Sequence, residues 1–241
     1  MNPMIETAMH LSTRLAGFSF SPPVLVVYDP TDYARYPLLR YFDRYGHPPK
    51  KAVFVGMNPG PWGMLQTGVP FGEVGIVRDW MGIEGPVGQP GKLHPKRPVQ
   101  GFACKRSEVS GSRLWGWARA RFKTAENFFS QFLVINYCPL AFFDDGGKNI
   151  TPDKLKSADR GELYALCDQA LRDSVQSLTP EFVVGIGRFA FERSMEALNG
   201  MEVTIGRVTH PSPANPAANR GWNAIVEKEL SDLGIRLPNH D

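Results

Sequence analysis

The sequence predicts an α/β fold: a three-layer α/β/α domain in which helices cover both faces of a central, mainly parallel four-stranded sheet. Four compact apolar runs end in small or polar residues, which is typical of strands buried on both faces. Helical patterns separate or follow these runs, and this alternation implies right-handed crossovers between parallel strands. The length of 241 residues is enough for a full core, so we expect a single domain over residues 1–241.

The first predicted elements are two helices. Apolar periodicity places them at about residues 5–15 and 33–42. The run Val24–Val27 between them has β character, but nothing in the sequence fixes its place in a sheet. The strands predicted for the central sheet are AVFVGMN (52–58), FLVINYC (132–138), FVVGIG (182–187) and VTIGRVTH (203–210). The helices that complete the layers are predicted over 157–178, 188–198 and 215–233.

Composition argues against membrane, disulfide and metal classes. The hydrophobic share of 42% and charged share of 21% are ordinary for a globular protein, and no apolar run approaches the roughly 20 residues of a spanning helix. The N-terminal stretch carries acidic and polar residues where a secretory signal needs a basic end, so we expect a cytoplasmic protein. The three cysteines include no CxxC pair, and the five histidines form no H-E-x-x-H motif. We therefore expect neither a disulfide framework nor a metal.

A basic segment runs from Lys92 to Lys123. It contains nine lysines and arginines against one acid, Glu108, whereas the whole chain has a net charge of only +3. Trp115 and Trp117 lie within it. Two interpretations stay open: a footprint for a phosphate backbone, or a solvated helix face with buried tryptophans.

Polar residues follow the predicted strands where a ligand cleft is expected. In open parallel sheets this cleft lies beyond the carboxyl ends of the strands. Asn58, Asn136 and His210 occupy these positions, and no carboxylate accompanies them. The segment GIGRFA (185–190) has the spacing of a dinucleotide loop, but a tight strand-to-helix turn explains it better, because no acid ends a following strand.

The chemistry of these residues favours recognition of a nucleobase. No G-x-S-x-G motif is present, so a serine hydrolase is not indicated. Asparagine reads the edge of a base through paired donor and acceptor contacts, and aromatic rings stack on its face. A single asparagine at a strand end is, however, more often a turn or cap residue.

Two longer segments carry a specific resemblance. GMNPGPWGMLQTGVPFGEV (56–74) and HPSPANPAANRGW (210–222) together resemble the signature segments of the single-strand-selective monofunctional uracil-DNA glycosylases, within the uracil-DNA glycosylase superfamily. NYCPL (136–140) and GIGRFAFERS (185–194) add weaker agreement. The resemblance implies an enzyme that hydrolyses the N-glycosidic bond of uracil in DNA and leaves an abasic site, without metal or cofactor. The motif segments hold no lysine for a Schiff base, which favours hydrolysis without strand cleavage. DNA is the expected partner, and a monomer is expected.

The resemblance also implies roles for individual residues. His210 matches the histidine that hydrogen-bonds O2 of the departing base, and Asn58 matches the residue that holds the attacking water. Asn136 matches the asparagine that reads the uracil edge. Phe71 matches the stacking ring, and Met57 contributes a backbone amide to the pocket.

Other positions bear on substrate choice and on DNA binding. Gly60 falls where some relatives carry a bulky residue that excludes the thymine methyl, so we expect room at C5 and cleavage of 5-substituted uracils such as 5-hydroxymethyluracil. Tyr137 stands where animal members have His, and Ala214 stands where they have Arg. The loop implied to contact DNA consists of Pro211, Ser212, Pro213, Ala214 and Asn215. A small Ala214 fills the gap left by a flipped nucleotide poorly, so we expect a preference for single-stranded or mispaired uracil.

Two alternatives stay open. One is a related glycosylase acting mainly on deaminated purines, hypoxanthine or xanthine. The lack of a side chain at Gly60 and the presence of Tyr137 favour this alternative. The other is a nucleic-acid-binding protein that keeps the pocket without turnover. The presence of both Asn58 and His210 argues against this alternative.

Overall fold

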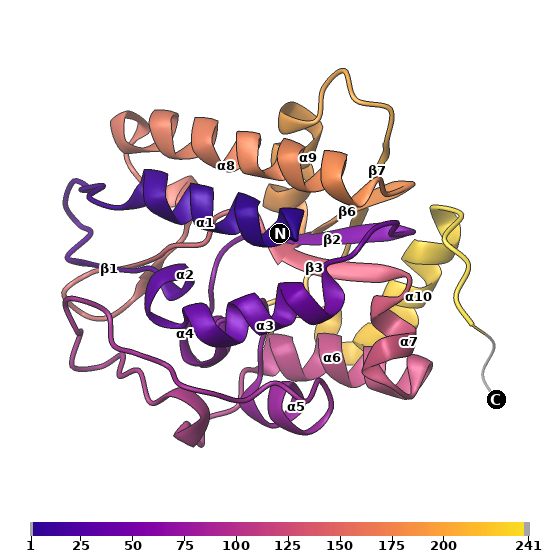
Figure 1. Ribbon diagram of the computed structural model, residues 1–241, viewed down its shortest axis with the longest axis horizontal. Helices are drawn as coiled ribbons and strands as arrows, with labels where there is room; N and C mark the ends of the chain where they lie inside the picture. Colours follow the sequence, from indigo (N-terminus) through magenta and orange to yellow (C-terminus); the bar gives the residue numbers. More distant parts are fainter. Residues whose placement is uncertain (1, 239–241) are drawn as a thin grey trace.

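The central sheet of the predicted fold is present in the computed structural model, which describes residues 2–238 (Figure 1). Within these residues a four-stranded sheet has the order β3-β2-β6-β7, and every neighbouring pair is parallel. The α/β/α fold class is therefore confirmed. The strands are β2 (Ala52–Gly56), β3 (Phe132–Asn136), β6 (Phe182–Ile186) and β7 (Thr204–Val208).

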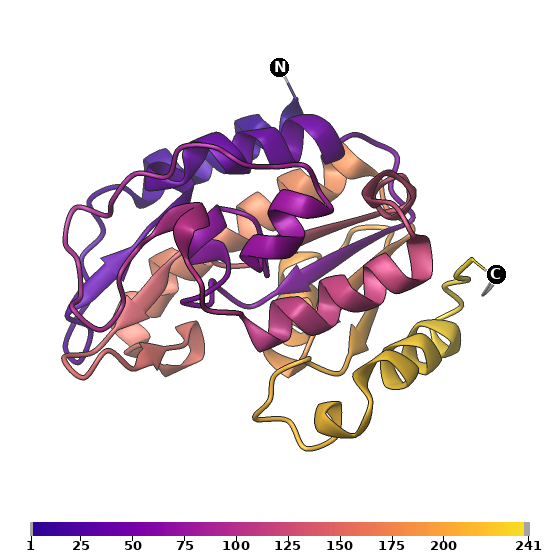
Figure 2. The ribbon, with the colours of Figure 1, turned by 90° about the horizontal axis from the view of Figure 1, so that it is seen from below.

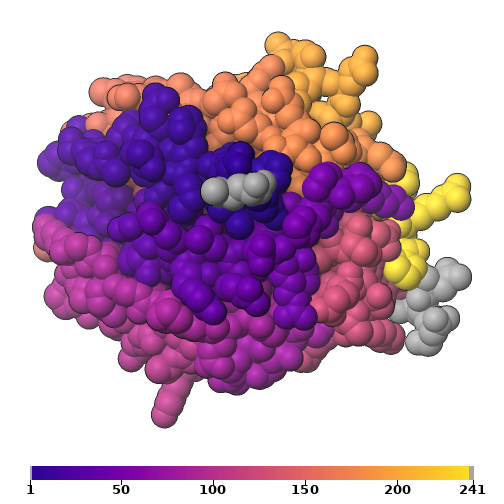
Figure 3. Space-filling view, viewed as in Figure 1, coloured from indigo at the N-terminus to yellow at the C-terminus, as the bar shows by residue number. Residues whose placement is uncertain are grey.

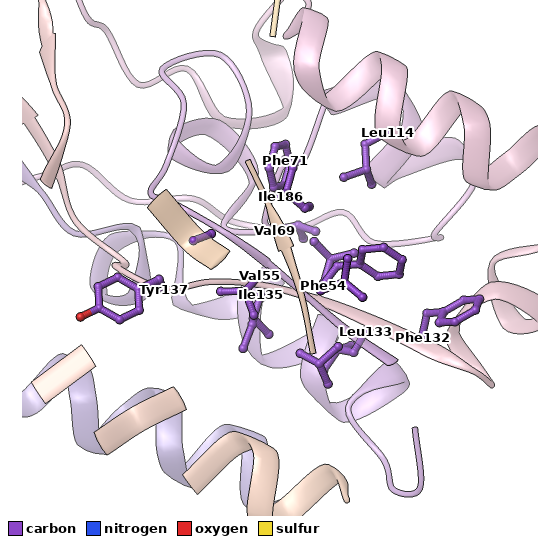
Figure 4. Packing of buried hydrophobic residues seen from close by; sticks show 14 of the residues in the cluster. Phe54, Val55, Val69, Phe71, Leu114, Phe132, Leu133, Ile135, Tyr137 and Ile186 are labelled. Carbon is purple, nitrogen blue, oxygen red and sulfur yellow. The ribbon is translucent and has the colours of Figure 1, made fainter. Parts of the chain in front are cut away.

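The sheet is the centre of the core. All five residues of β2 are buried, as are the first four of β3, because helices cover both faces. Figure 4 shows Phe54 and Val55 of β2 among Leu133 and Ile135 of β3 and Ile186 of β6. This packing fixes the carboxyl ends of the strands relative to one another, and those ends carry the polar residues singled out above.

Helices lie on both sides of the sheet. Helices α1, α8 and α9 lie on one side, and α6 and α10 on the other (Figures 1 and 2). Figure 3 shows α1 packed into the surface between α8 and α3. The helices of the first half are α1 (Pro3–Leu15), α2 (Pro30–Tyr33), α3 (Arg35–Tyr45), α4 (Met64–Thr67) and α5 (Val74–Asp79). Those of the second half are α6 (Val109–Phe122), α7 (Ala125–Phe129), α8 (Ser157–Leu178), α9 (Arg188–Ala197) and α10 (Trp222–Asp232).

The run at 24–27 belongs to a second, smaller sheet. Strand β1 (Val26–Tyr28) pairs antiparallel with β4 (Ala141–Phe143), which pairs with β5 (Asn149–Ile150). The partner of β1 lies more than 110 residues further along the chain, so local pattern did not reveal it.

The last predicted helix is too long at its start. Helix α10 begins at Trp222, and residues 215–221 form a loop with a single 3-10 turn (Ala218–Arg220). Gly221 has φ +125°, which is not a helical conformation, so α10 cannot extend toward the N-terminus beyond Trp222. The loop that follows His210 is therefore longer than the sequence predicted.

The basic segment contributes a buried helix face. Trp115 and Trp117 of α6 are 0% and 2% exposed, which confirms the interpretation of a helix with buried tryptophans. Lys105, Arg106 and Arg119 are exposed, so a contact with phosphates stays a prediction. Over residues 2–238, no helix has the length and apolar character needed to cross a membrane.

Candidate active site

An open pocket of about 560 Å³ lies beyond the carboxyl ends of the central strands. Most of the predicted site residues line it: Met57, Asn58, Gly60, Phe71, Asn136, His210, Ser212 and Pro213. Pro211, Ala214 and Asn215 belong to the same loop as His210 but do not line the pocket. The segment that follows β2 and the segment that follows β7 therefore form facing walls, although some 150 residues separate them in the sequence.

Asn136 and Phe71 meet above Gly56, the last residue of β2. A side-chain carbon on Gly56 would lie 2.4 Å from Asn136 Oδ1 and 2.6 Å from a ring carbon of Phe71, so only glycine leaves room for both. Asn136 Nδ2 lies 3.2 Å from Met64 Sδ, whereas Oδ1 is buried and has no hydrogen-bond partner among the described residues. A buried, unpaired acceptor is costly, and Asn136 lines the pocket, so a bound ligand with a donor would offset that cost.

Phe71 is held in a strained conformation. Its φ of +54° is rare for a residue with a side chain, and such strain concentrates at functional sites. Helix α6 approaches closely here, because a side-chain carbon on Gly111 would lie only 2.1 Å from the carbonyl oxygen of Phe71. The ring faces His210 with centroids 6.0 Å apart, so an aromatic face and an imidazole border the same space.

Asn58 is oriented by the backbone of the neighbouring strand-end loop. Its Nδ2 donates to the carbonyl oxygen of Leu140 at 3.1 Å. Because the nitrogen of the amide is used in this way, Oδ1 is the atom directed to other partners. An oriented acceptor of this kind can hold a water by one of its protons.

The hydrogen bonds of His210 fix its tautomer. The backbone N–H of Ser212 donates to Nδ1 at 3.0 Å, so the proton of the neutral ring is on Nε2. Burial lowers the pKa of His210 to about 4, and the ring is therefore neutral at pH 7. At neutral pH the His210 ring therefore offers one N–H donor, at Nε2.

Helix α10 anchors the residue before His210. The Glu229 carboxylate accepts hydrogen bonds from Thr209 N at 2.7 Å and from Thr209 Oγ1 at 2.6 Å, and Trp222 Nε1 donates to the Thr209 carbonyl at 2.7 Å. On the other side, Gly187 has φ +87° and lies close against the His210 side chain. Gly187 is also the N-cap of α9, so GIGRFA is the tight strand-to-helix turn that the sequence favoured.

The loop after His210 is tied to the basic helix α6. Arg113 donates to the carbonyl oxygen of Pro211 at 3.1 Å and to Asn219 Oδ1 at 2.8 Å. Asn219 Nδ2 in turn donates to the carbonyl oxygen of Pro213 at 2.9 Å. Pro213 and Ala214 stay exposed at the tip of the loop. The contacts of Arg113 could not be predicted from local pattern, since they join residues about 100 positions apart.

The pocket contains a carboxyl group that was not predicted to lie there. Glu108, the N-cap residue of α6, lines the pocket beside Gly60. The expectation that no carboxylate accompanies the strand-end residues is therefore wrong for the pocket as a whole. A side-chain carbon on Gly60 would lie 2.5 Å from Glu108 Oε1, and one on Gly63 would lie 1.6 Å from Oε2. The space that Gly60 leaves is thus occupied by a carboxyl group from a distant segment.

Comparison with known proteins identifies the family. Residues 44–230 match the profile of the uracil DNA glycosylase superfamily. The single-strand selective monofunctional uracil DNA glycosylases of Mus musculus and Bos taurus are each 46% identical to the chain over 233 residues, which is 96% of this chain and 84% or 86% of theirs. The chain belongs to this glycosylase family. The crystal structure of Pedobacter heparinus SMUG2 shares the fold, with a TM-score of 0.70, 18% identity and coverage of 96% of this chain and 97% of that one.

Tyr137 does not line the pocket. Its hydroxyl donates to Asp168 Oδ1 at 2.7 Å, and Arg193 Nε donates to the hydroxyl at 3.1 Å. Arg193 also pairs with Asp168 at 2.5 Å. Figure 4 shows the hydroxyl pointing away from Phe71. Tyr137 therefore links the end of β3 to α8 and α9 through Asp168 and Arg193.

Burial of Glu108 gives a testable dependence of stability on pH. Burial and the nearby Glu73 carboxylate raise the pKa of Glu108 to about 7 from its ordinary 4.5. The folded state then keeps a proton that the unfolded chain releases, so stability falls as pH rises from 4.5 through 7. We expect Glu108→Gln to gain up to about 3 kcal/mol over the wild type between pH 4 and pH 8.

Urea unfolding at pH 4, 6 and 8 measures this difference. The exposed Glu202→Gln serves as the control, since it removes the same charge from the surface. A stability difference between Glu108→Gln and wild type that stays constant from pH 4 to pH 8 would contradict the assignment.

Proposed function

We propose that this protein is a monofunctional DNA glycosylase that hydrolyses the N-glycosidic bond of uracil in DNA and leaves an abasic site. The observation that carries the proposal is the pocket in which Asn58, Asn136, Phe71 and His210 face one another. Relatives 46% identical over most of the chain are named single-strand selective monofunctional uracil DNA glycosylases, which supports the same activity here.

Asn136 selects the base. Its unpaired Oδ1 accepts the N3–H of uracil, and Nδ2 has a second proton to donate to O4. Cytosine has an unprotonated N3 and an amino group at C4, so it would place acceptor against acceptor and donor against donor. Phe71 stacks on the face of the base, which every pyrimidine allows, and the amide therefore supplies the specificity.

His210 stabilises the leaving group. When the C1′–N1 bond breaks, its electron pair stays on the base, and negative charge spreads to O2. The Nε2–H of the neutral ring donates to O2, and the Ser212 N–H holds the ring in that tautomer. A donor placed in advance where charge develops is among the strongest contributions to catalysis.

Asn58 positions the water. The sugar becomes cationic at C1′ as the base leaves, so a weakly activated water suffices as the nucleophile. Asn58 Oδ1 accepts one proton of that water, and the bond from Nδ2 to Leu140 holds the amide in place. The water oxygen bonds to C1′, and its proton is released to solvent or to the departing uracil anion. Neither a metal ion nor a cofactor takes part in these steps.

The mouth of the pocket has features that suit a DNA backbone. Trp62 lines the pocket, and the Arg106 guanidinium lies 4.3 Å from the centroid of its ring. Arg97 lies 5.7 Å from the same ring. Arginines beside an aromatic ring at an opening favour binding of phosphates together with unstacked bases. The loop 211–215 borders the same opening and is proposed to contact the DNA.

The decisive test is abasic-site formation from a single uracil in an oligonucleotide. We expect base release without strand cleavage, and no adduct trapped by borohydride, because the mechanism needs no Schiff base. A pocket that only binds nucleic acid would give no abasic sites from the wild type, and this outcome would replace the glycosylase proposal with the binding alternative.

Strand preference is a second expected result. Pro213 and Ala214 at the loop tip are small, so they replace a flipped base poorly, and opening a duplex costs a few kcal/mol. We expect kcat/KM for uracil in single strands to exceed that in a U·A pair by about tenfold. Ala214→Arg is expected to reduce this difference in kcat/KM between the single strand and the U·A pair. Equal rates on the single strand and the U·A duplex would contradict this expectation.

Neither of the two residues that favoured deaminated purines, Gly60 and Tyr137, supports that alternative here. Glu108 occupies the space beside Gly60, and Tyr137 lies outside the pocket. Cleavage of 5-substituted uracils stays a proposal, as do the monomeric state and the cytoplasmic location.

A further inference from the structure

The Glu108 side chain takes the place of side chains that the loop after β2 lacks. Gly60 and Gly63 both leave room for its carboxyl group, since a side-chain carbon on either residue would collide with it. The glycines and the carboxyl group come from segments about 45 residues apart, and Gly60 and Glu108 both line the pocket.

The orientation of the bound base directs C5 toward this wall. In the proposed function, O2 of the base faces His210, and N3 and O4 face Asn136. The next ring atom after C4 is C5, and it lies on the side of the ring away from His210. The loop after β2 and Glu108 line the pocket together, and they are the part proposed to face this edge.

Resting on the proposed function, we propose that Glu108 is a specificity-determining residue that accepts a hydrogen bond from a hydroxyl carried at C5 of the base and disfavours the methyl group of thymine. The pocket would thus be selective at C5 through a polar wall, and not open as Gly60 alone suggested.

The hydrogen-bonding state of Glu108 supports this role. Its Oε2 is buried and has no hydrogen-bond partner among the described residues. A methyl group placed against this carboxyl group offers no donor to its unpaired oxygen. A hydroxymethyl group supplies the donor. Carboxylate and carboxylic acid both retain an acceptor oxygen, so the contact does not depend on the charge of Glu108.

The first test uses the wild type and needs no variant. Single-stranded oligonucleotides carry uracil, 5-hydroxymethyluracil, 5-ethyluracil or thymine at one position. The ethyl and hydroxymethyl groups have nearly the same shape, but only the second donates a hydrogen bond. We expect single-turnover release of 5-hydroxymethyluracil to be at least about tenfold faster than that of 5-ethyluracil, and thymine release to be the slowest. Equal rates for the ethyl and hydroxymethyl bases would overturn the proposal.

The second test separates Glu108 from the electronic effect of the hydroxyl on the leaving group. Glu108→Leu keeps the bulk of the side chain without an acceptor, and Glu108→Gln keeps an acceptor oxygen. We expect Glu108→Leu to reduce the ratio of 5-hydroxymethyluracil to 5-ethyluracil release by about tenfold, and Glu108→Gln to restore it to within about threefold of wild type. The exposed Glu202→Gln is the matched control and should leave the ratio unchanged.

Uracil release distinguishes failure of this inference from failure of the proposed function. If Glu108→Leu cleaves uracil but keeps the wild-type ratio for the 5-substituted bases, the role of Glu108 is wrong and the glycosylase assignment stands. If the wild type releases no base from any of these oligonucleotides, the proposed function fails with it. Thermal unfolding of each variant shows that it is folded, and the wild-type comparison holds whether or not Glu108→Leu folds.

Discussion

Replacing His210 by alanine is expected to lower kcat for uracil release by about 10²–10³, with a much smaller change in KM. The substitution removes the Nε2–H donor that the Ser212 contact sets in place, and this donor acts on charge that develops only as the bond breaks. Single-turnover kinetics on a single-stranded uracil oligonucleotide measure the effect directly, because product release does not enter the rate.

His47→Ala is the matched control for this variant. His47 is exposed and does not line the pocket, so its removal should leave kcat unchanged. If His210→Ala raised KM while kcat stayed at the wild-type value, His210 would bind the ground state and the transition state equally, and its proposed role would be wrong.

Asn58→Ala is expected to lower kcat by about 10²-fold. Loss of the amide leaves the water without an oriented acceptor, and a misplacement of about 1 Å costs a factor of this size. Affinity for uracil-containing DNA should be retained, since Asn136 and Phe71 still hold the base. The measurements are single-turnover rates together with DNA affinity by fluorescence anisotropy.

Asn58→Asp gives the sharper comparison. A carboxylate accepts from the same water and adds basicity, so this variant should be clearly faster than Asn58→Ala. Asn199→Ala, at an exposed position outside the pocket, is the control. If Asn58→Ala cleaved uracil at the wild-type rate, the water would be held elsewhere.

Much of the fold follows from local pattern. Continuous apolar runs become parallel strands because only strands covered on both faces bury every side chain, and each of the four predicted strands is in the central sheet. The long helix predicted over 157–178 has the bounds of α8. The predicted start of the last helix was wrong, because the residues before Trp222 form a loop whose course depends on Arg113 and Gly221.

The polar groups at the strand ends could be predicted from local pattern alone. Asn58, Asn136 and His210 were identified because the carboxyl ends of parallel strands share one edge, whatever the details of packing. The two motif segments that contain Asn58 and His210 also pointed to the family that the comparisons establish.

The residues that complete that edge are brought there by the packing of the folded chain. Glu108 enters the pocket from the start of α6, Arg113 and Glu229 hold the His210 loop, and Tyr137 points away from the site. None of these lies at a predicted strand end except Tyr137, which follows Asn136 directly. Alternation along a strand end turns neighbouring side chains to opposite sides, whereas contacts over 20 to 106 residues depend on how the helices pack.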